Sequence, residues 1–142
     1  MQNIYQDLFD ALSHKLFTCQ LDAMTEHFVY PMPLYSGDHL QVFGAPCTFK
    51  EVLALYREAI EQAGVIRMAP RIVAQGVVIN KRSSIWVEWD HFQSADRPTL
   101  TSQVSYVLVH RDMTALPKIE MIEYKFTAFP KVTEQFASVK HA

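Results

Sequence analysis

The sequence predicts an α+β fold in which a curved, cone-shaped antiparallel β-sheet wraps around N-terminal helices. Three observations predict it. The first third of the chain has helical periodicity, the clearest helix pattern follows a short hairpin, and four long runs rich in β-branched and aromatic residues come after it. Short turns join these runs, so neighbouring strands pair antiparallel, because a parallel return needs a crossover of about a dozen residues. A sheet curved around helices normally encloses one pocket.

The N-terminal region predicts two helices and a strand that contains prolines. Apolar residues recur every four positions from Ile4 to Leu16, which is the spacing of one helix face. Thr18 is expected to cap a second helix. Two prolines, at positions 31 and 33, then stop helix formation and force extended backbone. We therefore expect residues 29–35 to form a short strand at an edge of the sheet.

A hairpin and a third helix follow. Gly37-Asp38 is a turn signal, and residues 40–43 return as the hairpin partner. Thr48 and Glu51 have the spacing of a capping box, in which the hydroxyl and the carboxylate each satisfy a free backbone donor. Gly64 stands where the end of a helix favours glycine. The pattern therefore predicts a helix over residues 48–63.

The second half of the chain predicts four strands. Their ranges are Ile66–Ile79, Ser84–Phe92, Thr101–Arg111 and Lys118–Phe126. Gly76, inside the first of them, indicates a bulge that curves the sheet. Residues 131–139 predict either a short terminal helix or a loose tail.

The composition is typical of one globular domain that covers residues 1–142. Apolar residues make up 49% of the chain, which excludes a disordered protein. The net charge is −2 without a block of Lys or Arg, so we expect neither nucleic acid nor a membrane as partner. No apolar run approaches the ~20 residues that span a bilayer, and the N-terminus lacks a secretory signal pattern. Cys19 and Cys47 predict buried, reduced thiols in a cytoplasmic protein.

Two of the predicted strands are apolar on both faces. In residues 85–92, Trp86 and Phe92 lie on the face opposite Val87 and Trp89. A sheet that helices cover on one side should alternate more cleanly between apolar and polar residues. We therefore expect a homodimer that packs through the outer sheet face at Trp86 and Phe92. The alternative is that the terminal segment folds back over that face.

The layout resembles the nuclear transport factor 2-like superfamily, and within it the SnoaL-like and ketosteroid-isomerase-like branch. The segments that carry the resemblance are the helices ending at His27-Phe28, the strand Tyr30-Pro31-Met32-Pro33, the helix from Thr48, Trp86-Val87-Glu88-Trp89, Tyr106–Asp112, Lys118-Ile119 and Ile122-Glu123-Tyr124. The resemblance covers about residues 5–130 and implies a cystatin-like architecture and chemistry that needs no cofactor. Members of the family include isomerases, cyclases, dehydratases, hydrolases, transport factors and binding domains, so the resemblance does not select one activity.

One position departs from the pattern of the family. Catalytic members often place an acidic residue just after the second helix, facing the pocket. Here that stretch reads His27-Phe28-Val29-Tyr30, and the nearest carboxylate, Glu26, is expected on the helix surface. The sequence therefore does not support proton transfer by a carboxylate at this position.

Two histidines are candidate catalytic residues. Proton abstraction next to a carbonyl needs a base with a pKa near neutrality and a donor for the resulting oxyanion. If Trp89 faces the helices, His91 does too, because strand side chains alternate. The resemblance places Tyr106 and His110 on the concave face of the next strand. A histidine and Tyr106 within one apolar pocket would supply the base and the donor. The alternative is that each histidine is a hydrogen-bonded or rim residue.

Aromatic residues are the candidate ligand contacts. Tyr30, Tyr56, Trp89 and Phe126 are candidates because apolar walls with a few polar tips are the usual form of a small-molecule site. Tyr56 lies on the apolar face of the helix that should roof the pocket. The resemblance adds Glu123 on the last strand, although the sequence leaves the facing of Glu123 ambiguous. Plain core and interface packing is the alternative for the whole set.

Other kinds of site find little support in the sequence. Glu88 and Asp90 share one strand face. The two carboxylates could form an acid–base pair, bind a cation, or be solvated charges at the edge of an interface. We favour solvated charge. The six histidines include no helix-spaced pair, and no Cys-x-x-Cys occurs, so no metal site is expected. The chain has neither a Gly-rich phosphate loop nor a Gly-x-Ser-x-Gly elbow.

These observations favour a protein that recognises a small hydrophobic or aromatic molecule in an apolar pocket. Cofactor-independent acid–base chemistry of the isomerase, cyclase or dehydratase type would be its catalytic form, and it requires a histidine or carboxylate beside a tyrosine in the pocket. Two alternatives stay open. A non-catalytic small-molecule binding module needs no such pair, and a protein-interaction domain that docks through its sheet face predicts a filled core and an exposed apolar face.

Overall fold

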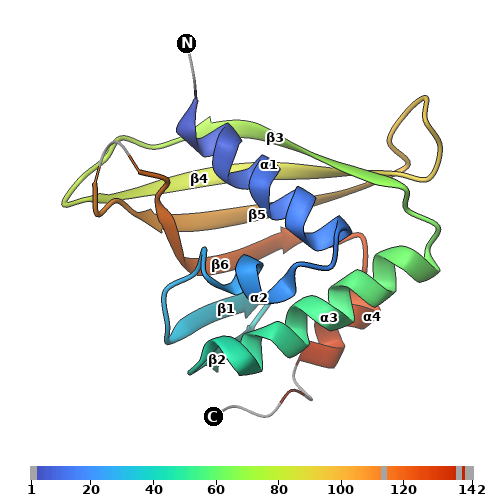
Figure 1. Ribbon diagram of the computed structural model, residues 1–142, viewed down its shortest axis with the longest axis horizontal. Coiled ribbons are helices and arrows are strands. Elements are labelled where there is room, and N and C mark those ends of the chain that lie inside the picture. The colour runs from blue at the N-terminus through green and yellow to red at the C-terminus, as the bar shows by residue number, and fades with distance from the viewer. Residues whose placement is uncertain (1–2, 113–114, 137–138, 140–142) are drawn as a thin grey trace.

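The chain folds into helices that lie over one face of a six-stranded sheet (Figure 1). The computed structural model describes residues 3–112, 115–136 and 139. Its elements are α1 (Ile4–Phe17), α2 (Leu21–Thr25), β1 (Met32–Ser36), β2 (His39–Phe43), α3 (Pro46–Gln62), β3 (Arg67–Gln75), β4 (Arg82–Phe92), β5 (Leu100–Val109), β6 (Lys118–Phe126) and α4 (Pro130–Gln135). Within these described ranges, no helix is both long and apolar enough to cross a membrane.

The order of the strands confirms the predicted fold class with one departure. The sheet runs β2-β1-β6-β5-β4-β3, is curved and open, and pairs antiparallel except between β1 and β6, which are parallel. The sheet is therefore mixed and not wholly antiparallel. The sequence argument concerned strands joined by short turns, and β1 and β6 are not joined by one.

The strand with the prolines was predicted at the edge of the sheet, but it lies one place inside the edge. The outermost strand on this side is β2, and β1 pairs with β2 and with β6. The parallel ladder runs only from Leu34, paired with Ile122, to Ser36, paired with Tyr124. Pro31 and Pro33 precede this ladder, so their missing N–H groups cost it no hydrogen bond.

Two predicted helix caps are wrong. Thr18 ends α1, where its hydroxyl donates to the carbonyl of His14 at 2.8 Å, and α2 begins after Gln20. The helix expected to start at Thr48 starts at Pro46, because proline at the first helical position fixes φ and needs no hydrogen-bond partner. The Thr48 hydroxyl donates to Ala45, so it does not cap the helix.

The C-terminal end of α3 is as predicted. Gly64 follows the last turn of α3 with a φ of +74°, in the left-handed region that glycine adopts without strain.

The prediction for the cysteines is wrong. Cys19 and Cys47 were expected to be buried, but both are exposed. Cys19 lies in the turn between α1 and α2, and Cys47 lies in the first turn of α3 on the face away from the sheet.

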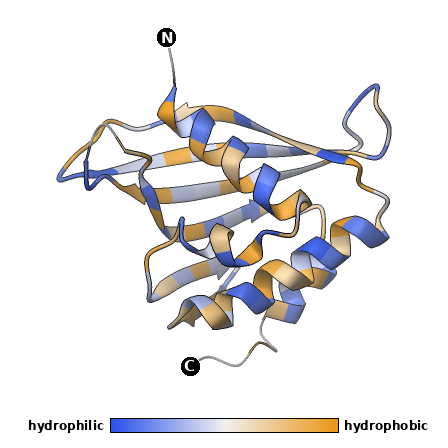
Figure 2. Cartoon of the chain, viewed as in Figure 1, coloured by the Kyte–Doolittle hydropathy of each residue, from blue (hydrophilic) through white to orange (hydrophobic). Residues whose placement is uncertain are grey.

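The core lies between the helices and the concave face of the sheet. Figure 2 shows apolar and polar positions alternating along α1 and α3, as expected for helices with one buried face. The largest fully buried side chains come from both layers: Phe9, Phe43, Phe49, Phe136, Leu8, Leu16, Met32, Leu34, Ile60, Ile85, Leu108 and Ile119. Burial of each such side chain contributes about 1.5–3 kcal/mol, so the packing of helices on sheet carries most of the stabilisation.

The outer face of the sheet is only partly as predicted. Trp86 is 49% exposed, but Phe92 is 8% exposed because the Arg67 guanidinium lies 3.7 Å from the centre of its ring. The alternative, a terminal segment folded over this face, is not what the described residues do. α4 packs beside α3 on the helical side of the sheet (Figure 1).

The bulge expected at Gly76 lies three residues earlier. The register shifts between Ile72 and Ala74 and leaves Val73 as the extra residue of β3. Gly76 follows the end of β3, and its N–H donates to the Ser84 carbonyl at 2.8 Å. A Cβ at Gly76 would lie 3.5 Å from that carbonyl oxygen, which is ordinary van der Waals contact, so the structure gives no steric reason for glycine there.

Candidate functional site

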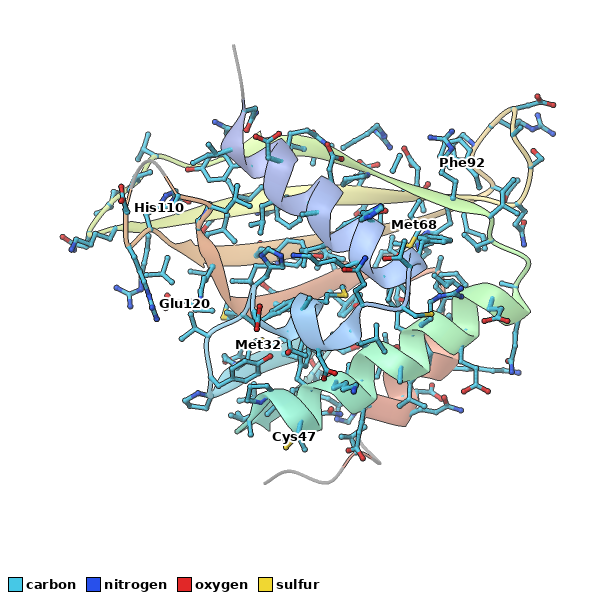
Figure 3. All side chains as sticks on the ribbon, viewed as in Figure 1. Met32, Cys47, Met68, Phe92, His110 and Glu120 are labelled. Atoms are coloured by element: carbon cyan, nitrogen blue, oxygen red, sulfur yellow. The ribbon has the colours of Figure 1, made fainter. Side chains whose placement is uncertain are left out.

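An apolar cavity lies between α1, α3 and the concave face of the sheet. Its volume is about 60 Å³, and residues from α1, α2, α3, β1, β3, β4, β5 and β6 line it, together with Phe136 at the end of α4. Met68, labelled in Figure 3, belongs to this wall on the β3 side. None of the described lining residues carries a charge. The polar groups that reach it are hydroxyls, from Ser13, Ser102 and three tyrosines, and the indole of Trp89.

A tyrosine and a histidine form a hydrogen-bonded pair at this wall. The Tyr56 hydroxyl, from α3, lies 2.7 Å from Nε2 of His91, which is fully buried on β4. Nδ1 of His91 faces the carbonyl oxygen of Leu100 at 3.3 Å. A carbonyl can only accept, so Nδ1 carries the proton and Nε2 accepts from the tyrosine hydroxyl. Burial lowers the pKa of His91, which keeps the imidazole neutral at neutral pH.

A second hydrogen bond on the strand side presents a free hydroxyl proton. The Trp89 indole N–H donates to the Tyr106 hydroxyl oxygen at 2.8 Å, so the proton of that hydroxyl stays available to another acceptor. Tyr124, on β6, also lines the cavity, and burial raises its pKa to about 12. Burial likewise raises the pKa values of Tyr56 and Tyr106, so all three tyrosines are neutral donors at neutral pH.

The segment after β6 holds the tyrosine–histidine pair in place. The ring of Phe129 packs edge-on against His91 and Tyr56, with centroid distances of 5.0 and 6.0 Å. The backbone N–H of Ala128 donates to the Ser102 hydroxyl at 2.9 Å, which ties this segment to β5. The segment therefore orients both rings of the pair.

His110, the other candidate base, does not line the cavity. Figure 3 places it at the end of the sheet opposite Phe92. Its Nε2 lies 3.0 Å from the Ser83 hydroxyl and 3.2 Å from that of Tyr5, and its Nδ1 has no hydrogen-bond partner among the described residues. Burial lowers its pKa. The structure thus brings Tyr56 and Tyr106 to one cavity, places His91 behind Tyr56 as its hydrogen-bond partner outside the lining, and leaves His110 in a separate buried cluster.

Three of the predicted ligand contacts also lie elsewhere. The Tyr30 hydroxyl donates to the Thr25 carbonyl at 2.9 Å, outside the lining of the cavity. Glu123 lies on the outer sheet face, 3.1 Å from the Lys125 ammonium. Phe126 is 59% exposed. Of the predicted contacts, Tyr56 and Trp89 line the cavity.

The acidic pair on β4 has a structural partner. Arg71 contacts Glu88 at 2.9 Å and also binds Asp90, on the outer face of the sheet. The guanidinium holds the pKa of Asp90 below its usual value, so Asp90 is an ionised partner of Arg71, and Glu88 forms a second ion pair with the same arginine. Among the described residues, no cluster of three or more His, Cys, Asp or Glu is placed to hold a metal ion.

Some lining residues had no signal in the sequence. Ser102 reads as an ordinary strand serine, and Phe136 falls in the stretch predicted as a short helix or a tail. Tyr124 is one of two alternating sets on the last strand, and the pattern alone does not say which set faces the helices. These residues are recognisable only once α4 and β6 are placed.

Comparison with known proteins identifies the fold. No protein-family model and no curated protein matches the sequence. A nuclear transport factor 2-like protein of unknown function from Shewanella oneidensis superposes with a TM-score of 0.61 at 17% identity, over 85% of this chain and 95% of that one. A domain of unknown function with a cystatin-like fold from Nostoc punctiforme gives 0.59 at 14% identity, over 96% and 85%.

The chain has the nuclear transport factor 2-like fold.

A third structure with this nuclear transport factor 2-like fold has an enzyme name. It is a candidate scytalone dehydratase from Novosphingobium aromaticivorans, with a TM-score of 0.58 at 14% identity, over 87% of this chain and 81% of that one. Identities this low establish the shared fold and not a shared activity. The narrower resemblance to the SnoaL-like and ketosteroid-isomerase-like branch therefore stays a prediction.

Proposed function

We propose that this protein binds a small, uncharged, hydrophobic carbonyl compound in the cavity and catalyses cofactor-independent proton transfer next to the carbonyl. The observation that carries the proposal is the 2.7 Å hydrogen bond between Tyr56 and His91 at the wall of an apolar cavity. Acid–base chemistry requires a base beside a tyrosine in the pocket, whereas a binding module does not. The pair therefore favours chemistry over binding alone.

The proposed proton path runs through Tyr56. The Tyr56 oxygen takes a proton from the carbon next to the carbonyl while its own proton passes to Nε2 of His91. The electron pair of the broken C–H bond moves to the carbonyl oxygen, which accepts a hydrogen bond from the free hydroxyl proton of Tyr106. Return of the proton to a different carbon gives an isomer, and loss of a neighbouring hydroxyl as water gives a dehydration product.

The lining of the cavity supports an uncharged substrate. None of the described lining side chains is charged, so a carboxylate, phosphate or ammonium of the ligand would be desolvated without a counter-ion. A carbonyl oxygen needs only a donor, and the Tyr106 hydroxyl offers one.

The size of the cavity limits the ligand further. A volume of about 60 Å³ is smaller than the roughly 150 Å³ of an engineered cavity that holds one benzene ring. A cyclic ligand therefore needs one wall to move. Most other lining residues belong to paired strands or to the long helices α1 and α3, and the short helix α2 packs against both of these helices. Phe136 caps the six-residue helix α4, which packs mainly against α3, so Phe136 is the wall that moves most easily.

The proposal is tested with cyclopentanone as a small neutral probe. Exchange of its α-protons for deuterium is followed by proton NMR with the purified protein. Tyr56→Phe and His91→Gln are each expected to lower the catalysed rate about 100- to 10,000-fold. Tyr106→Phe is expected to lower it about 100- to 1,000-fold, because one oxyanion donor is lost. Tyr30→Phe removes a hydroxyl outside the cavity and should leave the rate unchanged.

Binding is measured separately through the Trp89 indole N–H resonance, with exposed Trp86 as the internal reference. If the probe shifts the Trp89 resonance but its α-protons do not exchange faster, the protein is a non-catalytic binding module. No shift at Trp89 at any probe concentration would refute the proposed pocket itself.

A further inference from the structure

The hairpin turn between β3 and β4 carries exposed apolar side chains at its tip. Val77, Val78 and Ile79, which we call the apolar tip, are all exposed, with values of 76% for Val77 and 64% for Ile79. Backbone hydrogen bonds in both directions between Ile79 and Arg82, at 2.8 and 3.0 Å, close the turn. The apolar tip is therefore held on a closed hairpin, and its exposed aliphatic surface is unfavourable in water alone.

The connection between β5 and β6 lies beside this hairpin. The backbone N–H of His110 donates to the carbonyl of Lys81 at 2.7 Å, which joins the two turns. Figure 1 shows both turns at the same end of the sheet, on the left of the view. Leu116, in the second turn, is exposed as well. Two segments that are distant in the sequence thus place apolar side chains at one end of the molecule.

Positive charge is in excess around the apolar tip. The basic residues of the two turns are Lys81, Arg82, Arg111 and Lys118. Within residues 76–82 and 110–118 the sequence has a single acidic residue, Asp112, and Glu120 on β6 pairs with Arg82. The expectation of no membrane partner concerned net charge and runs of Lys and Arg in the sequence, whereas these cations come from separate turns and gather only in the fold.

Lys81 occupies a backbone position that favours glycine. Its φ is +66° and that of Asn80 is +52°, so two successive residues of the turn lie in the left-handed region. Glycine is the usual second residue of such a turn because it has no Cβ to clash. A lysine at this position keeps a cation at the apex of the hairpin, next to the apolar tip, in spite of an unfavourable backbone conformation.

We propose that this end of the sheet binds the surface of an anionic lipid bilayer, with the apolar tip among the acyl chains and Lys81 and Arg111 at the level of the headgroup phosphates. Binding at such an interface combines burial of apolar surface with the attraction of cations to anionic lipid, and this end of the molecule offers both. Nucleic acid is anionic too, but aliphatic side chains offer its bases no stacking surface. The proposal is independent of the Tyr56–His91 pair, which lies between α3 and β4.

Co-sedimentation of the full chain with lipid vesicles tests the proposal. The protein is expected to bind vesicles of phosphatidylcholine mixed with phosphatidylglycerol. It should bind phosphatidylcholine alone about 5- to 30-fold more weakly, because each of the two cations contributes about fivefold. Raising the salt concentration from about 0.15 M to about 1 M should weaken binding to the mixed vesicles for the same reason.

A matched pair of variants tests the apolar tip. Ile79→Asp is expected to weaken binding to mixed vesicles at least about 10-fold, because it places a negative charge among the apolar side chains. Ile66→Asp is the control and should bind as the unmodified protein does. Ile66 is 61% exposed, but its N–H donates to the carbonyl of Phe92, at the end of the sheet opposite His110 (Figure 3).

Lys81→Gly separates a role in binding from a role in folding. Glycine suits a φ of +66°, so the urea midpoint of this variant should equal or exceed that of the unmodified protein. Its affinity for mixed vesicles should nevertheless fall about fivefold.

Three results would overturn the proposal. They are no binding to mixed vesicles, equal binding to phosphatidylcholine alone, and equal binding by Ile79→Asp and the unmodified protein. In the first case another polypeptide would be left as the partner of the apolar tip. Circular dichroism of each variant shows that a loss of binding is not a loss of folding.

Discussion

The His91 imidazole has no solvent exposure, and its base form is the one that the proposed proton path needs. Burial lowers its pKa below the ordinary value of 6.5. A protonated His91 cannot accept the proton of Tyr56. We therefore expect the exchange rate to stay constant as the pH falls through 6.5 and to drop only at the lowered pKa. The measurement is the pH profile of cyclopentanone exchange beside an NMR titration of the His91 ring.

The two profiles should fall together if His91 is the base. A rate that already declines above pH 6.5, while the His91 ring is still neutral, would assign the base to another group. His110→Gln is a suitable control variant, because His110 is also buried but bonds to Tyr5 and Ser83 and not to Tyr56.

Single residues show how far the sequence could lead to this site. Strand alternation correctly predicted that His91 faces the helices with Trp89, and helical spacing correctly placed Tyr56 over the pocket. Their contact could not be predicted, since it depends on the rotation of α3 about its axis and on its height above β4. His110 is buried on the expected side but lies beyond the cavity, because periodicity gives the face of a residue and not its distance along the sheet.

We expect the short helix α4 to limit the size of the ligand. Phe136, at its end, is 1% exposed and lines the cavity. Phe136→Ala is expected to lower the free energy of unfolding by about 3–5 kcal/mol, as for other buried phenylalanines, and to enlarge the cavity. Urea denaturation measures the first effect. Titration of the Trp89 resonance with 2-indanone, a ligand larger than cyclopentanone, measures the second.

A graded variant makes the prediction on Phe136 more specific. Phe136→Leu should lose less stability and should admit 2-indanone less well than Phe136→Ala. Equal binding of 2-indanone by the unmodified protein and by Phe136→Ala would show that another wall moves and that α4 does not limit ligand size.

A bulge in β6 explains why the sequence did not show which of its side chains face the helices. Ile119 and Ile122 are both buried although they are three residues apart, because the register shift opposite Val107 and Leu108 leaves Glu120 as an extra residue. The strict period of two assumed in the sequence therefore left the facing of Glu123 ambiguous. The bounds of β6 itself, Lys118–Phe126, are those predicted, since β-branched and aromatic content locates a strand even where its phase changes.

The whole molecule should be sensitive to mild acid. Burial lowers the pKa of His27, His91 and His110, while the unfolded chain keeps the ordinary value of 6.5. Below 6.5 the unfolded chain binds more protons than the folded one, so stability is fully present above pH 6.5 and is lost as the pH falls through the folded pKa values. The midpoint of urea denaturation should be lower at about pH 5 than at about pH 8. The difference between the two midpoints should be smaller for His110→Gln.

His39→Gln provides the control for this prediction, because His39 is exposed on β2. A pH dependence that begins only below about pH 4 would assign the acid sensitivity to carboxylates such as Asp90, whose pKa Arg71 holds low, and not to the histidines.

The overall architecture was accessible from the sequence because its strongest signals are local. Short turns between four successive strands indicated an antiparallel sheet, and a helix pattern between hairpin and strands indicated what covers it. The pairing of β1 with β6 was not accessible, since no local pattern links a strand near the start of the chain to one near its end. The outer-face dimer stays a prediction on the same ground, because it depends on a contact that the single chain does not contain.

The parallel contact between Leu34 and Ile122 also fixes an order of events on the ribosome. The β1–β2 hairpin emerges before the other strands, but the strand that anchors it to the sheet is synthesised after all of them. Until β6 leaves the exit tunnel, the nascent N-terminal third has a hairpin without its anchoring strand and helices without the sheet they cover. The native layout can therefore be completed only after β6 has left the exit tunnel, and chains that stop before β6 should be substrates for chaperones and proteases.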